Sequence, residues 1–104
     1  MGEILTINYS IKNITDKAAE LFDFPAYPFY VQVEGNKKLK NAIMKHDMAF
    51  YEEALKQINA ISDEDGSTKV FERAKLQRIV FGEAGITSED LVWMCERMDD
   101  MYYR

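Results

Sequence analysis

The sequence predicts an α+β fold in a single domain that spans residues 1–104. In this fold, a short N-terminal two-stranded β element with an intervening short helix precedes three helices packed as a small helical domain. Apolar and polar side chains alternate over residues 5–12 and again over residues 29–33, and the apolar side chains after residue 36 follow helical spacing. A chain of 104 residues buries about 65% of its unfolded surface, which suffices for one hydrophobic core.

The first third of the chain is predicted to run strand, helix, strand. Residues 5–11 carry large apolar side chains at every second position, which is typical of a half-buried strand. The apolar spacing changes to three and four residues over residues 13–24, which indicates a short helix that ends before Pro25. Alternation returns over residues 29–33, and a Gly-Asn pair after them supplies a turn.

Three helices are predicted in the rest of the chain. Residues 37–61 form the longest helical pattern, with one apolar stripe along it. Residues 68–81 are also helical but carry apolar side chains on two opposite sides, which predicts burial between two neighbouring elements. The last helix lies within residues 85–104, where Thr87 and Asp90 form a near-match to a capping box at its start.

The charge is negative overall and unevenly distributed. The chain has a net charge of −5, with 13 basic and 18 acidic residues. Residues 37–46 hold four lysines and no acid, whereas residues 83–100 hold six acids and one arginine. An acidic surface of this kind is suited to a basic protein partner and disfavours non-specific binding to nucleic acid. The alternative, that these charges only keep a small protein soluble, stays open.

The sequence predicts a cytoplasmic protein that does not contact a membrane. The single cysteine, Cys95, cannot form a disulfide within the chain, so a reducing compartment is expected. No apolar run approaches the roughly 20 residues that a membrane span needs. The first ten residues also lack the basic and apolar regions of a secretory signal.

Residues 61–72 resemble the calcium-binding loop of the EF-hand family. They read "ISDEDGSTKVFE", lie between two predicted helices, and match the family at the third, fifth, sixth and twelfth positions. The matching residues are Asp63, Asp65, Gly66 and Glu72, although an isoleucine stands where the family has its first aspartate. The resemblance implies a degenerate, calcium-responsive domain with Asp63, Asp65 and Glu72 as the metal ligands.

No catalytic signature is present, so the chain is predicted not to be an enzyme. There is no phosphate-binding loop, dinucleotide fingerprint or Ser-His-Asp order. His46 lies on an apolar helical stripe, which indicates a structural role, and no base stands near Cys95 to activate it. Residues 71–98 resemble a helix-turn-helix, but their second helix presents acids that would repel phosphate. Apart from calcium in the loop, no cofactor is expected.

Trp93, the only tryptophan, stands on the acidic side of the last predicted helix. The apolar residues that form the opposite, core-facing side are Leu91, Met94, Cys95, Met98, Met101 and Tyr102. Glu89, Glu96, Arg97 and Asp100 lie three, four and seven residues from Trp93. Two alternatives follow. Either a second element of the domain, such as the N-terminal strands, covers Trp93, or it is an anchor for another protein within a charged rim.

These observations predict a small acidic protein-binding module, typical of the inhibitors and adaptors that phages and other mobile elements encode. Its predicted partner is a host protein with a basic surface, and the partner-binding residues are Trp93, Glu89, Glu96, Arg97 and Asp100. Carboxylates in place of phosphates would let it act as a nucleic-acid mimic toward a nucleic-acid-handling protein. A calcium-responsive domain and a phage assembly chaperone are the alternatives, and a homodimer formed through the Met-rich stripe is a further option.

Overall fold

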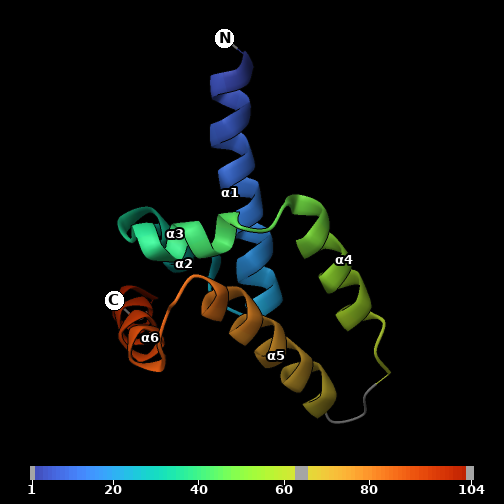
Figure 1. Cartoon of the computed structure of the whole chain (residues 1–104). Helices are drawn as coiled ribbons and strands as arrows, with labels where there is room; N and C mark the ends of the chain where they lie inside the picture. The colour runs from blue at the N-terminus through green and yellow to red at the C-terminus, as the bar shows by residue number, and fades with distance from the viewer. Residues whose placement is uncertain (1, 63–65, 103–104) are drawn as a thin grey trace.

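A computed structural model of the chain shows six α-helices and, within the described residues, no strand (Figure 1). The structure describes the backbone of residues 2–62 and 66–102 and the side chains of residues 11–62 and 66–101. In chain order the helices are α1 (Gly2–Phe22), α2 (Ala26–Gly35), α3 (Lys37–Met44), α4 (Met48–Asn59), α5 (Ser67–Glu83) and α6 (Ser88–Tyr102). The predicted α+β fold with its two-stranded β element is therefore wrong.

The predicted first strand and the helix after it are one long helix, α1. The residues of a single apolar stripe succeed one another at intervals of three or four: Ile4, Ile7, Ile11, Ile14, Ala18 and Leu21. The alternation over residues 5–11 overlaps this longer repeat, and neither glycine nor proline interrupts residues 3–24. Thr15 is buried, and its hydroxyl is satisfied there because it donates a hydrogen bond to the Ile11 carbonyl at 2.8 Å.

The predicted second strand is the middle of α2. Pro25 precedes the first residue of α2 and Pro28 lies in its first turn, where the missing N–H has no partner to lose. The two prolines therefore begin a helix instead of bounding a strand. Phe29 and Val33, four residues apart, both point into the core and are fully buried.

The predicted long helix over residues 37–61 is broken into α3 and α4. The Asp47 side chain accepts a hydrogen bond from the Phe50 N–H at 3.0 Å and so begins α4. The buried Tyr51 hydroxyl donates to the Ile43 carbonyl at 2.8 Å, which satisfies one of the last carbonyls of α3. Burial, and to a lesser degree the Glu83 carboxylate, raise the pKa of this hydroxyl, which keeps it a donor.

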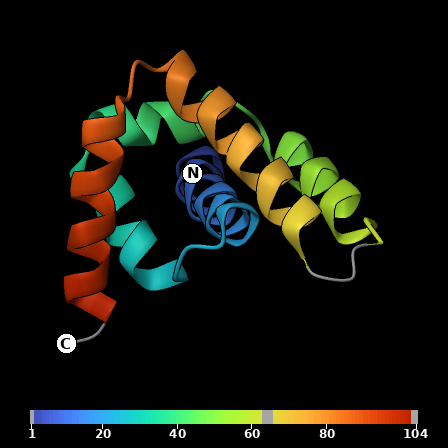
Figure 2. The same ribbon diagram turned by 90° about the horizontal axis from the view of Figure 1, so that it is seen from below.

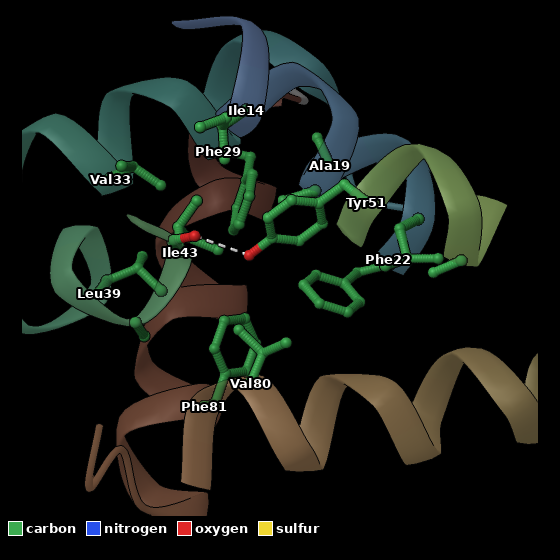
Figure 3. Packing of buried hydrophobic residues seen from close by; sticks show 14 of the residues in the cluster. Ile14, Ala19, Phe22, Phe29, Val33, Leu39, Ile43, Tyr51, Val80 and Phe81 are labelled. Atoms are coloured by element: carbon green, nitrogen blue, oxygen red, sulfur yellow. Dashed lines mark hydrogen bonds between the residues drawn. The ribbon is translucent and has the colours of Figure 1, made fainter. Parts of the chain in front are cut away.

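The hydrophobic core draws on all six helices, with α1 at its centre. Figure 2 looks along α1 and shows the other helices arranged around it. Helix α1 packs against α2, α3, α4 and α5, whereas α6 packs on α2. Figure 3 shows the buried side chains, among which the Phe22 and Phe81 rings lie 5.3 Å apart between centroids. One face of α6 is therefore core, and the other has no described helix against it.

Helix α5 is buried at its C-terminal end only, so its predicted burial between two neighbours is wrong for the first half. Val80 and Phe81 are buried in the core, but Val70 and Phe71 are each 61% exposed. Figure 1 shows the reason: the N-terminal half of α5 runs out beside α4, away from the centre of the bundle.

Candidate functional site

The start of α6 is fixed by the predicted capping box, which the hydrogen bonds confirm. The Thr87 N–H donates to Asp90 Oδ2 at 2.9 Å, and the Asp90 N–H donates to Thr87 Oγ1 at 3.2 Å. The turn before it closes at Gly85, whose φ of +75° suits glycine, with the Ile86 N–H donating to the Phe81 carbonyl at 3.0 Å. These bonds set the rotation of α6 about its axis.

The Asp90 cap makes the stability of the fold depend on pH. Hydrogen bonds from the Thr87 N–H, the Lys38 ammonium 2.9 Å away and the Thr87 hydroxyl lower the pKa of Asp90 to about 2. A carboxyl with a lowered pKa in the folded state stabilises the fold above its ordinary pKa of about 4 and loses that contribution as pH falls toward 2.

We therefore expect Asp90→Asn to lower the urea midpoint at pH 7, with the deficit shrinking as pH falls from about 4 toward 2. Asp99→Asn, an exposed site on the same helix, should change the midpoint little at any pH, and a pH-independent deficit for Asp90→Asn would contradict the assignment.

The inner face of α6 is the predicted core face. Met94 and Met98 are buried, and Leu91 and Cys95 are partly buried against the same cluster. The side chain of Tyr102, which was assigned to this face, lies outside the described residues. The core-facing side of the last helix is thus confirmed for the residues that can be assessed.

Trp93 lies on the opposite side of α6 and is exposed. We call this side the outer face, formed by Ser88, Glu89, Val92, Trp93, Glu96, Arg97, Asp99 and Asp100. The Trp93 side chain is 51% exposed, and Val92 beside it is also exposed. Residues 5–11 and 29–33, predicted as strands, are helical, and no described helix packs on this side, so no described element covers Trp93. The Arg97 guanidinium stacks over the indole, with 5.4 Å between its central carbon and the ring centroid.

The carboxylates of the outer face are free to meet another molecule. Glu89 and Glu96 stand two helical turns apart, about 10 Å along the axis, with Val92 and Trp93 on either side of the line between them. An open hollow of about 330 Å³ lies among Ser88, Glu89, Val92, Trp93 and Glu96. Within the described part of the chain, none of the four acids of this face forms an ion pair. The arrangement joins exposed apolar surface to a net negative charge, since the face holds four acids and one arginine.

The proposed calcium loop is only partly described. Asp63 and Asp65 lie outside the described residues, and Glu72 lies on α5, one and a half turns from its start. Because α5 already begins at Ser67, the seventh-position carbonyl that an EF-hand uses as a ligand belongs to a helix and points along it, away from the loop. The described part of this segment therefore does not fit a calcium loop. Elsewhere in the described chain, no group of three or more His, Cys, Asp or Glu residues is placed to hold a metal ion.

A groove between α4 and α5 is a feature that sequence reasoning missed. It has a volume of about 620 Å³ and an apolar floor. Its lining comprises Phe50, Glu53, Ala54, Gln57, Ile58 and Ile61 from the α4 side, and Thr68, Glu72, Lys75, Leu76 and Ile79 from α5. The two-sided apolar pattern of α5 was its signal, because one of those sides faces the groove. Its rim mixes acids with a lysine, so its charge selects no particular ligand.

His46 and Cys95 have structural surroundings. The His46 ring stacks on Phe50 at 4.1 Å between centroids, and its Nε2 lies 3.4 Å from a Glu83 oxygen without forming a hydrogen bond. Burial, with a smaller effect of the Asp99 carboxylate, raises the pKa of the Cys95 thiol, which disfavours the nucleophilic thiolate.

Comparison with protein-family models, curated proteins and solved structures gave no match to this chain. No helix within residues 2–62 or 66–102 is long and apolar enough to cross a membrane. Function has therefore to be inferred from the chain's own surface.

Proposed function

We propose that this chain is a small, non-enzymatic protein-binding module that docks on a basic surface of another protein through the outer face of α6. The observation that carries the proposal is Trp93, half exposed among carboxylates that form no ion pair with a described residue, on a helix whose other side is core. An inhibitor or an adaptor, of the kind that mobile elements encode, would need only such a surface.

The outer face combines an exposed indole, which can be buried by a partner, with carboxylates, which attract a basic surface. Burying the exposed half of an indole removes roughly 100 Å² from water, which contributes about 2.5 kcal/mol to binding. Tryptophan is enriched among the interface residues that dominate binding energy. The surrounding carboxylates raise the association rate with a basic partner and fix its orientation.

A nucleic-acid-handling partner is the version that the charge of this face favours. The four carboxylates of the outer face place negative charge where a nucleic acid would present phosphates. A basic groove that binds phosphates would also attract these carboxylates. The role would then be that of an inhibitor that occupies the groove.

Affinity capture with matched baits tests the proposal. The wild-type chain, Glu89→Lys/Glu96→Lys and Glu52→Lys/Glu53→Lys are immobilised separately and exposed to a lysate of the cells in which the protein acts. All four glutamates are exposed, and both variants change the net charge equally, but only the first pair lies on α6. We expect a protein retained by the wild-type and α4-variant baits to be lost from the α6-variant bait. Equal retention by all three baits would contradict the proposed docking face.

A further inference from the structure

Helix α5 carries an exposed basic and aromatic row that no described residue compensates. Phe71, Lys75 and Arg78 are all exposed and follow one another at intervals of four and three residues, so they share one side of α5. Neither Lys75 nor Arg78 forms an ion pair within the described chain. Val70, also exposed, lies beside Phe71. We call Phe71, Lys75 and Arg78 the α5 row.

The outer face of α6 carries a row of matching length and opposite charge. Trp93, Glu96 and Asp100 follow one another at intervals of three and four residues, and all three are exposed. The first and last residues of each row are seven positions apart, which is about 10 Å of helix. With the two helices parallel, Phe71 would meet Trp93, while Lys75 and Arg78 would meet Glu96 and Asp100. Each contact would join one aromatic pair to two ion pairs.

The two rows cannot satisfy each other within one molecule. Helices α5 and α6 are joined by a short turn and diverge from it, as Figure 2 shows, and they make no close helix–helix contact. The core side of each helix is already occupied, by Val80 and Phe81 in α5 and by Met94 and Met98 in α6. Nothing in the described part of the chain covers the two exposed rows, so they are open to another molecule.

We propose that the outer face of α6 is covered, in the free protein, by the α5 row of a second copy of this chain. A twofold axis makes the contact twice, because each copy supplies one α5 row and one outer face of α6. The charge complementarity of the two rows and their equal length select this occupant over an unrelated protein. The inference rests on the proposed function in using the same face, and an external basic partner would compete with the second copy for it.

A charge-swap experiment tests the dimer by sedimentation velocity over a dilution series. Lys75→Glu/Arg78→Glu makes both rows acidic, and Glu96→Lys/Asp100→Lys makes both rows basic. We expect the wild type to form a dimer at about 0.05 M salt that dissociates at about 1 M, where the screening length falls to about 3 Å. Each variant alone should be monomeric, with association weakened at least about 100-fold by the like charges. Their equimolar mixture should form a dimer again, because both contacts then join opposite charges.

Controls keep the test decisive. Glu52→Lys/Glu53→Lys should stay dimeric, and circular dichroism should show the two charge-swap variants folded, since all four substituted side chains are exposed. If a variant does not fold, dilution of the wild type still reports on the contact through fluorescence, because Trp93 is the only tryptophan and its emission should shift to longer wavelength.

A monomeric wild type, a dimer unaffected by either reversal, or a mixture that stays monomeric would overturn the dimer. In those cases a partner captured through α6 would still uphold the proposed function. A charge-swappable dimer with no α6-dependent capture would uphold the dimer and remove the function.

Discussion

Phe81→Ala lowers the free energy of unfolding by about 3–5 kcal/mol, the cost of removing a buried phenylalanine ring and leaving a cavity. The Phe81 side chain is 1% exposed and packs against Phe22 in the centre of the bundle. Since a domain of this size has a total stability of about 5–15 kcal/mol, the loss should be visible as a large fall in the urea midpoint.

Phe71 provides the matched control, because it is the same residue type on the same helix but 61% exposed. Phe71→Ala should change the free energy of unfolding by less than about 0.5 kcal/mol when measured at high salt and low protein concentration, where self-association is suppressed. Equal costs for the two substitutions would mean that α5 is rotated about its axis relative to the structure.

The second large effect is expected on binding. Trp93→Ala should weaken the affinity for a captured partner by at least about 30-fold, which corresponds to the 2 kcal/mol that defines a dominant interface residue. At high salt and low protein concentration, where self-association is suppressed, the same substitution should leave the free energy of unfolding within about 0.5 kcal/mol of the wild type, because half of the indole is already exposed to solvent.

Met94→Ala, one residue further along α6, should have the opposite profile. Met94 is 3% exposed in the core, so its truncation should cost about 2–5 kcal/mol of stability. The affinity of the fraction that remains folded should stay unchanged. A Trp93→Ala protein as destabilised as Met94→Ala would show that Trp93 is a core residue, and the account of the outer face would then fail.

The sequence predicted the last helix well because its signals are local. The capping box needs only Thr87 and Asp90, three residues apart, and the two faces of α6 follow from helical geometry within a single segment. The N-terminal third was predicted wrongly for the same reason. Over seven residues, alternation of apolar side chains resembles a strand, and only the longer stripe that reaches Leu21 identifies α1 as a helix.

Two other predictions were wrong because they rested on residues that occur in more than one kind of structure. Pro25 was taken only as the end of a helix, whereas proline is also favoured at the start of a helix, where Pro25 and Pro28 stand in α2. Asp47 interrupts the pattern of residues 37–61 without breaking its three-and-four spacing, so the N-cap that begins α4 was overlooked.

The candidate site shows the same contrast between features of a single helix, which could be predicted, and features that depend on distant segments, which could not. The outer face of α6 could be predicted because all its residues belong to one helix. The groove between α4 and α5 and the exposure of the α5 row could not, since both depend on where α5 leaves the core, which is decided by contacts between distant segments. The Lys38–Asp90 ion pair, at 2.9 Å across 52 residues of sequence, is another such contact.

The most direct test of the docking face is the ¹⁹F resonance of 5-fluorotryptophan incorporated at Trp93, which gives one signal because the chain has one tryptophan. Titration with a partner obtained by capture should shift or broaden that signal at the same partner concentration at which sedimentation shows the complex forming. A complex that forms while the fluorine signal keeps its position and width would place the interface elsewhere and contradict the assignment of the outer face of α6.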